Sequence, residues 1–331
     1  MNHRLTRRSA FVTVAGAAIW AARPRRASAK PMMTYATLLD PSQDAVMYGI
    51  KAGKVKSDIL DIEVHQLGLP AIIQATATKQ YDVLQGASIS IPRALDQGLK
   101  LTILSTALRF RTAGQAIWVK ADSPYKSVRD LKGKTLGVYA INSTGITLLR
   151  IAVWKKYGLN VNLQGGDLKW VELPAAGLPG ALSTGKIDAA AFIQSQDYNA
   201  GKTGEFRQLT LTAQDLYDIY KLHFVTGVNT GYPEKIDAQQ NLYVEFCRMM
   251  KATADYARTH LDEISQIVGE SSKEDPGYFK AWFTKYDEAP MVITNDDIKA
   301  IRTTWQLSKE LGILDDYPDP ATVVWSKALR R

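Results

Sequence analysis

The chain has 331 residues, which is long for one ordinary domain and comfortable for two. Hydrophobic residues make up 46% of the chain and charged residues 22%, so the composition is that of a globular protein and excludes extensive disorder. The formal charge is +8, but it falls to +2 once the six arginines of the first 29 residues, a segment without acidic residues, are left out. A remainder this close to neutral gives no electrostatic basis for binding nucleic acid.

Residues 1–29 have the layout of a secretory signal peptide. A basic start is followed by a short apolar run at 10–22 and then by Ala27-Ser28-Ala29, after which we expect cleavage. The pair Arg7-Arg8 resembles a twin-arginine export signal, with Phe11 one position later than that pattern usually has it. The weakly apolar core favours this route over general secretion, so we predict a periplasmic protein. Beyond this segment, no stretch reaches the roughly 18 apolar residues of a membrane span.

From residue 34 the sequence alternates between short apolar runs and helical patterns. Strands are predicted at 34–39, 59–66, 81–84 and 99–105, and helices at 43–53, 69–79 and 91–97. Gly53 and Gly98 come at the ends of two of these helices, as glycine commonly does. Alternation of this kind is typical of βαβ units and of a mainly parallel sheet.

A second run then repeats the same order. Strands are predicted at 136–139, 169–172 and 187–192, and helices at 145–157 and 178–184. Asp82 and Asp188 fall at matching points of the two runs, each just before an apolar stretch. Few residues are identical between the runs, so the repeat is one of layout.

Two extended stretches, 115–120 and 222–229, bracket the second run, and helical patterns follow at 239–258, 260–269, 275–286 and 295–311. Helices without strands cannot form a third α/β unit, so we place them against the first sheet. The predicted fold class is α/β, with two Rossmann-like domains joined by two crossover strands and the C-terminal helices packed on the first domain. The first domain would comprise 30–118 and 226–331, the second 119–225, and a cleft would lie between them.

Short polar residues follow several predicted strands, where the next helix begins. The first turn of a helix has unpaired N–H groups and a partly positive dipole end, which suits an anionic or strongly polar small group. Capping alone would explain a single Ser or Thr, but four such junctions converge on the predicted cleft, beyond the C-terminal strand ends where open α/β sheets bind ligands. The predicted ligand-binding residues are Asp40, Ser42, Gln43, Ser88, Asn142, Ser143, Thr144, Gln194 and Asp197.

Arg109 is a further candidate, because it lies between the strand predicted at 99–105 and the first crossover. An arginine in this position could bind a carboxylate or sulfonate through two parallel hydrogen bonds. The alternative is a solvated loop arginine.

The run SVRDLKGKTLGVYAINSTGITLLRIAVWKKYGLN resembles the second-domain entry of periplasmic solute-binding proteins of the nitrate, taurine, aliphatic-sulfonate and thiamine-precursor type. The shared features are Leu-Lys-Gly-Lys at 131–134 before the strand, Ser and Thr at the helix start, and Tyr-Gly-Leu at 157–159. The stretches KQYDVLQGAS and STGKIDAAAF resemble two further segments of this family. The resemblance covers nearly all of residues 31–325.

The resemblance implies a type II periplasmic-binding-protein clamp, a monomer that closes on a small solute and delivers it to the membrane permease and ATPase of an ABC importer. The solute could be a sulfonate, an amino-sulfonate, a carboxylate or a pyrimidine. Asp40-Pro41 departs from the family pattern, since many relatives have an aromatic or small residue there. A carboxylate in the cleft favours an amine-bearing or zwitterionic solute over a simple anion such as nitrate.

Signatures of catalysis are missing from the sequence. There is no His-Glu-x-x-His, nucleophile elbow, phosphate loop or paired-cysteine metal site, and we expect neither a catalytic residue nor a metal or cofactor. Two alternatives remain: an exported enzyme on the same fold, and a binding subunit for a sensor kinase or another importer class.

Overall fold

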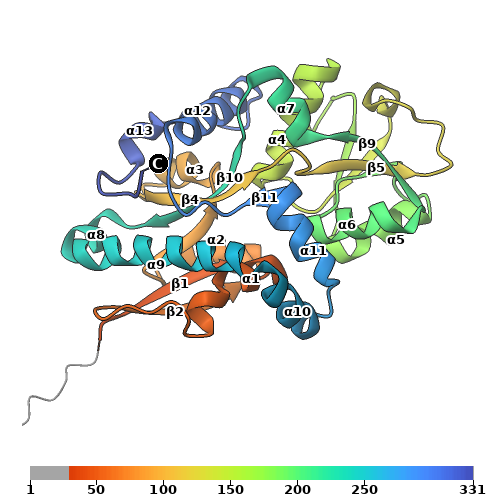
Figure 1. The fold of residues 1–331 in the computed structure, drawn as a ribbon. Helices are drawn as coiled ribbons and strands as arrows, with labels where there is room; N and C mark the ends of the chain where they lie inside the picture. Colours follow the sequence, from red (N-terminus) through yellow and green to blue (C-terminus); the bar gives the residue numbers. More distant parts are fainter. Residues whose placement is uncertain (1–29, 331) are drawn as a thin grey trace, which may run out of the picture.

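The strands form two separate sheets in the computed structural model, which describes residues 30–330 (Figure 1). The first sheet consists of β1 (Met32–Leu38), β2 (Asp61–Leu67), β3 (Val83–Ala87), β4 (Thr102–Phe110), β10 (Val225–Gly231) and β11 (Asp287–Glu288). The second consists of β5 (Ala116–Lys120), β6 (Thr135–Val138), β7 (Lys169–Glu172), β8 (Ala189–Ala190) and β9 (Phe206–Leu211). In space the orders are β11-β4-β10-β3-β1-β2 and β7-β6-β8-β5-β9.

Each sheet has a parallel part built by βαβ units and an antiparallel part. β1 pairs in parallel with β2 and β3, and β6 does so with β7 and β8. β10 is antiparallel to β3 and β4, whereas β5 is antiparallel to β8 and β9. The two extended stretches predicted as crossovers are therefore strands of the sheets that they enter.

Helices complete a first lobe around the first sheet and a second lobe around the second. The first lobe has α1 (Pro41–Lys51), α2 (Leu69–Ala77), α3 (Ser90–Asp96), α8 (Pro233–Ala238), α9 (Gln240–Thr259), α10 (Leu261–Ser272), α11 (Pro276–Ala281), α12 (Asn295–Glu310) and α13 (Pro320–Val323). The second has α4 (Thr144–Tyr157), α5 (Leu178–Ser183), α6 (Gln194–Thr203) and α7 (Thr212–Tyr220). Together the lobes have the α/β clamp architecture that the sequence predicts.

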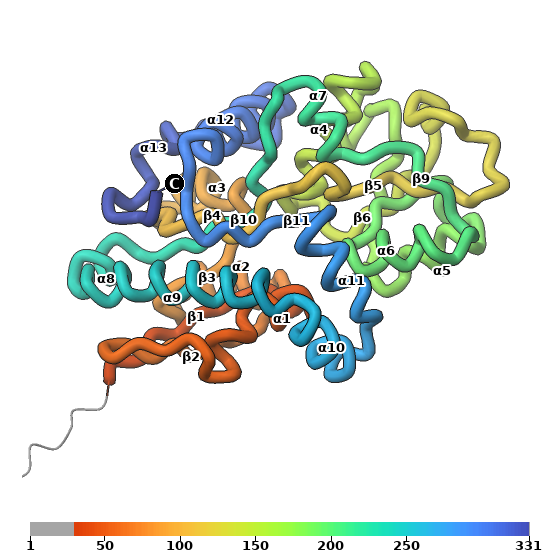
Figure 2. Tube along the Cα trace, viewed as in Figure 1, coloured from red at the N-terminus to blue at the C-terminus, as the bar shows by residue number. Residues whose placement is uncertain are grey.

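The C-terminal helices pack mainly on the first lobe, as expected. The long helix α9 crosses the face of the first sheet beside α1 (Figure 2). The two helices approach closely at Gly49, where an added Cβ would lie 2.8 Å from the Thr253 hydroxyl oxygen. α12 also contacts α4, and α11 contacts α6, so the C-terminal segment touches the second lobe as well.

The backbone crosses from one lobe to the other twice. It leaves the first sheet at Phe110 and enters the second at Ala116, and it returns after α7 to β10 (Figure 2). On this side an apolar core is shared, because Leu148 of α4 and Leu216 of α7 belong to the same buried cluster as Trp305 of α12. The two passages and this shared cluster therefore connect the lobes.

Asp82 and Asp188 have equivalent structural roles in the two lobes. Asp82 Oδ2 accepts a hydrogen bond from the Thr34 backbone N–H at 2.9 Å, and Asp188 Oδ2 accepts one from the Thr135 backbone N–H at 2.9 Å. In each lobe this bond links the start of one parallel strand to the residue before its neighbour. The repeat of layout in the sequence is therefore also present in the structure. In both lobes the carboxylate stabilises the packing of two neighbouring strands.

Several predicted boundaries shift in the structure. The strand predicted at 187–192 is paired only over β8, while the strand predicted at 99–105 continues as β4 to Phe110. The helical pattern at 275–286 is α11 followed by a π-helical turn (Trp282–Tyr286) and then by β11, which is too short to produce a periodic signal. The predicted signal peptide lies outside the described residues.

Candidate functional site

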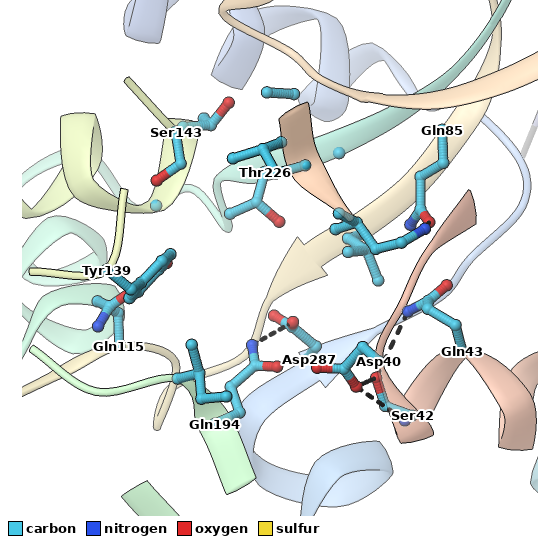
Figure 3. Close-up of a pocket in the computed structure, with 18 of the residues that line it drawn as sticks. Asp40, Ser42, Gln43, Gln85, Gln115, Tyr139, Ser143, Gln194, Thr226 and Asp287 are labelled. Atoms are coloured by element: carbon cyan, nitrogen blue, oxygen red, sulfur yellow. Dashed lines mark hydrogen bonds between the residues drawn. The ribbon is translucent and has the colours of Figure 1, made fainter. Parts of the chain in front are cut away.

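A cavity of about 370 Å³ lies between the lobes (Figure 3). The first lobe lines it with the ends of β1, β3 and β4 and with residues of β10 and β11. The second lobe lines it with residues that follow β6 and β8 and with the starts of α4 and α6. Strand ends of both sheets thus face one shared space, which is where open α/β folds place ligands.

Asp40 forms the N-cap of α1 at one wall of the cavity. Its Oδ1 accepts hydrogen bonds from the Ser42 backbone N–H at 2.8 Å and from the Ser42 hydroxyl at 2.5 Å. Pro41 begins the helix, a position where proline loses no hydrogen bond. Burial raises the pKa of Asp40, and the bonds from Ser42 oppose that rise. The carboxyl group is therefore held in place by the geometry of the helix start.

Asp287 of β11 is the second carboxylate of the cavity and is 2% exposed. Its Oδ2 accepts a hydrogen bond from Gln194 Nε2, and Gln194 Oε1 accepts one from the Trp282 indole at 3.0 Å. Gln194 thus connects α6 of the second lobe to two residues of the first lobe. Burial raises the pKa of Asp287 to about 7, a rise to which the negative charge of Asp40 adds.

Gln85 of β3 is held beside the end of β1. Its Oε1 accepts hydrogen bonds from the Thr37 hydroxyl and from the Leu38 backbone N–H, the latter at 3.3 Å. The Thr37 hydroxyl also lies 3.2 Å from Gln43 Oε1, which ties Gln43 to the same group. Gln85 Nε2 is buried without a partner among the described residues. Gln85 lines the cavity, so this unpaired donor lies in its wall.

The second lobe adds a rigid pair, Gln115 and Tyr139. The Tyr139 hydroxyl donates to Gln115 Oε1 at 2.9 Å, and Gln115 Nε2 donates to the Phe192 carbonyl at 3.0 Å. Gly145 makes this arrangement possible, since an added Cβ would lie 2.7 Å from the Tyr139 hydroxyl oxygen. The close approach at Gly145 is therefore made by a neighbouring side chain of the protein.

Ser143 and Thr144 begin α4, as the sequence predicts, and both line the cavity. Ser143 is the N-cap: its Oγ accepts from the Ile146 backbone N–H at 3.2 Å and donates to the Ala140 carbonyl at 2.9 Å. The Thr144 hydroxyl accepts from the Ile89 backbone N–H at 3.3 Å, so it connects the lobes. Both hydroxyls therefore already have partners within the protein.

Six predicted residues meet around the cavity, namely Asp40, Ser42, Gln43, Ser143, Thr144 and Gln194. Four others do not line it. Ser88 is fully buried and donates to the Val225 carbonyl at 3.0 Å, while Asn142 is exposed and offers its backbone carbonyl to Arg93 at 3.2 Å.

Arg109 and Asp197 face away from the cavity for geometric reasons. β4 continues through Arg109, and side chains alternate along a strand, so Leu108 and Phe110 line the cavity while Arg109 points to the opposite face. There its guanidinium pairs with Glu288 at 2.7 Å and with Asp297 at 2.8 Å.

Asp197 lies almost one turn into α6 and not at its start. Its Oδ1 accepts the Trp118 indole N–H at 2.5 Å. It is buried against the body of the second lobe, and it contributes to that lobe's packing instead of to the wall of the cavity.

Sequence reasoning missed Gln85, Gln115, Tyr139, Trp282 and Asp287, which all line the cavity. Tyr139 is the last residue of the strand predicted at 136–139, next to the polar junction, so the junction pattern was a signal for it. Asp287 and Trp282 come from the C-terminal helical segment, and no local pattern connects them to the cleft.

Two features are absent from residues 30–330. No group of three or more His, Cys, Asp or Glu side chains in that range is arranged to hold a metal ion. None of its helices combines the length and apolar character that crossing a bilayer requires.

Comparison with known proteins identifies the family. The sequence model described as NMT1/THI5 like matches residues 26–264, well over half of the chain. This match confirms the family resemblance found in the sequence. No curated protein sequence matches at a significant level.

Solved structures share the fold. The periplasmic aliphatic sulphonate-binding protein SsuA of Escherichia coli has a TM-score of 0.71 at 14% identity, covering 89% of this chain and 92% of its own. The alkanesulfonate-binding protein SsuA of Xanthomonas axonopodis pv. citri, bound to MOPS, has a TM-score of 0.72 at 17% identity, covering 92% and 100%. The CA3427 gene product of Candida albicans, with the generic periplasmic binding protein fold, has a TM-score of 0.68 at 14% identity, covering 91% and 98%.

Proposed function

The chain belongs to the NMT1/THI5-like family, and from this premise we propose that it is the exported substrate-binding component of an ABC importer. It would capture a small polar organic solute in the cavity between the lobes and present it to the permease and ATPase. The observation that carries this proposal is that one cavity is lined by both lobes, which are connected by two passages of the chain and share an apolar core.

In this proposal the lobes are the two domains of a clamp, 30–118 with 226–331 and 119–225. β5 (Ala116–Lys120) belongs wholly to the second sheet, which supports moving the first boundary from 118 to the segment just before β5, at 111–115. A solute that contacts both lobes only in the closed state favours closure, since it adds interactions that the open state lacks.

Gln194 is the contact that distinguishes these states, because its two bonds to the first lobe break when the lobes separate. Buried groups left without partners by an unsuitable solute would cost roughly 1–3 kcal/mol each, which is a source of selectivity. The solute classes expected from the sequence are sulfonates, amino-sulfonates, carboxylates and pyrimidines.

Binding and closure test this function together. The purified chain is titrated with a panel of sulfonates, amino acids, aromatic acids and pyrimidines while thermal stability and the radius of gyration in small-angle X-ray scattering are followed. A binder should raise the melting temperature and reduce the radius of gyration without being consumed. Consumption of the ligand would instead support the exported-enzyme alternative, and absence of any binder would contradict the proposal.

Export and partner choice need separate experiments. Lysine at both Arg7 and Arg8 should keep the precursor in the cytoplasm if the twin-arginine route is used. Co-purification with a permease and ATPase, and not with a sensor kinase, would support the importer. The expected monomer is checked by light scattering.

A further inference from the structure

The polar part of the cavity carries negative charge without a positive counterpart. Asp40 and Asp287 line it, while no lysine, arginine or histidine of residues 30–330 does. Figure 3 shows the two carboxylates as neighbours, and the charge of Asp40 is close enough to act on Asp287. An anionic solute would meet two carboxylates there and no cationic side chain.

Asp287 is a buried acceptor that lacks a partner on one oxygen. Its side chain is almost fully buried, Oδ2 is taken by Gln194, and Oδ1 has no hydrogen bond within the described chain. Leaving a buried carboxylate oxygen unpaired is costly. A hydrogen-bond donor in the cavity would remove this cost, and a positively charged donor would remove more of it.

The nearest guanidinium does not supply that donor. Arg111 lies behind Asp287, outside the cavity lining, and its Nε donates to the Asp287 backbone carbonyl at 3.3 Å. Its Nη2 is 3.9 Å from Glu288 Oε2, so its charge is shared with another carboxylate. The Asp287 carboxylate therefore lacks a direct ion pair in the structure.

The other walls are apolar and aromatic. Leu38, Leu69, Leu108, Phe110, Phe192 and Trp282 contribute to them. Such walls favour an apolar body, and aromatic faces also attract a neighbouring cation. The cavity thus combines a carboxylate pair with a surface suited to hydrocarbon or an aromatic ring.

We propose that the solute is a small organic cation: a protonated nitrogen with N–H donors lies between Asp40 and Asp287, and an apolar body packs against the aromatic walls. This inference rests on the proposed function and narrows its solute class. N–H donors are required because Asp287 Oδ1 lacks a hydrogen-bond donor, which a quaternary ammonium cannot provide.

Calorimetric titration with size-matched probes tests the charge preference. The probes are benzylamine, benzyl alcohol and benzoate, the corresponding phenethyl and butyl series, and benzyltrimethylammonium. We expect at least one amine to bind, with an affinity at least tenfold above its alcohol and above benzyltrimethylammonium, and its carboxylate to show no binding.

Several other results would contradict this inference. Preferential binding of a carboxylate or an alcohol would overturn the inference and leave the solute-binding function intact, and so would saturation of the site by Ca²⁺ or Zn²⁺ alone. Binding only by compounds of the sulfonate, acid and pyrimidine panel that lack a cationic nitrogen would do the same. Failure of every compound of every charge would count against the proposed function too.

Two near-isosteric variants identify the residues. Asp40→Asn and Asp287→Asn should each weaken binding of the best amine at least tenfold while binding of its alcohol changes little. Asp122→Asn, an 80% exposed aspartate outside the cavity lining, is the matched control and should bind as the parent does. Equal binding of the amine by the parent and Asp287→Asn, with folding verified by circular dichroism, would refute the assignment.

Discussion

Gln194 of α6 donates its side-chain amide to the carboxylate of Asp287, which lies 93 residues further along the chain in β11. The same glutamine accepts the Trp282 indole N–H, so one side chain of the second lobe connects to two residues of the first. β11 is an edge strand of the first sheet, and α6 lies between β8 and β9 of the second, so this contact joins the two lobes across the cavity. In the proposed clamp it would form only when the lobes are closed.

Replacing Gln194 by alanine should therefore favour the open clamp. The change leaves Trp282 and Asp287 without their partner across the cleft, at a cost of roughly 1–3 kcal/mol to the closed state. We expect about a tenfold or larger loss of affinity for the best ligand by calorimetry, and a larger radius of gyration at subsaturating ligand. Asn199→Ala, an exposed position on the same helix, should change neither quantity.

The stability of the unliganded protein should fall as the pH rises through the titration of Asp287. The pKa of this group is raised from 3.8 to about 7 by burial, so between these values the unfolded chain releases a proton that the folded chain retains. The free energy of unfolding then decreases from about pH 4 to about pH 7 and stays level at higher pH. One pKa unit corresponds to about 1.4 kcal/mol, so the total decrease is on the order of 4 kcal/mol.

Asp287→Asn removes this titration, so its unfolding free energy in urea should lack that decrease and exceed the parent's at pH 8. Besides burial, the groups that act on Asp287 in the folded protein are Gln194, Asp40 and Arg111. Asp122→Asn, whose side chain is 80% exposed, is the control and should keep the parent profile. Identical profiles for the parent and Asp287→Asn would contradict the prediction.

Gly145→Ala should disturb the cavity through a neighbouring side chain. The new Cβ would lie 2.7 Å from the Tyr139 hydroxyl oxygen and 3.3 Å from Gln115 Oε1, so the bond between these two groups must break or shift. We expect a loss of about 1–3 kcal/mol in stability and weaker ligand binding. Thermal denaturation and calorimetry measure the two effects.

Gly180→Ala is the matched control for this substitution. Gly180 lies within α5, and an added Cβ would meet nothing within 4 Å. Alanine favours a helix interior over glycine by roughly 0.5–1 kcal/mol, so this variant should be at least as stable as the parent. Equal effects of the two substitutions would show that the contact between Gly145 and Tyr139 is unimportant.

The equivalent aspartates Asp82 and Asp188 should each stabilise their own lobe. Asp188→Asn weakens the hydrogen bonds that the carboxylate accepts from the Thr135 backbone N–H and from the Tyr125 hydroxyl at 2.8 Å. We expect a loss of about 1–2 kcal/mol in urea denaturation, and a similar loss for Asp82→Asn, which also loses the ion pair with Lys235 at 3.1 Å. If neither substitution lowered the free energy of unfolding, these hydrogen bonds would not be important for stability.

Much of the fold could be predicted from local patterns. The start of α4 at Ser143 and its end at Gly158, with φ of 71°, follow from capping preferences that depend on a few neighbouring residues. The order of strands and helices, and hence the α/β class, follows from hydrophobic periodicity and chain alternation. For the same reason the junction residues Asp40, Ser42, Ser143 and Gln194 were found, since each lies where a strand gives way to a helix.

The direction of individual side chains could not be predicted in this way. An end of β4 five residues later than expected turns Arg109 into a strand residue, and strand alternation then points it away from the cavity. Because α6 begins at Gln194, Asp197 lies about one turn into the helix, where its side chain points toward Trp118. Small errors in element boundaries therefore reverse the side on which a residue lies.

By itself the sequence determined the element types, the family and the polar junctions, because these depend on near neighbours in the chain. Only the tertiary structure decided which charges share the cavity. It brings Asp287 and Trp282 from the C-terminal segment to face Gln194. It also keeps the Arg109 guanidinium outside the cavity, where it pairs with Glu288 and Asp297. Charge balance in a cleft depends on contacts between distant segments, and local patterns do not encode those contacts.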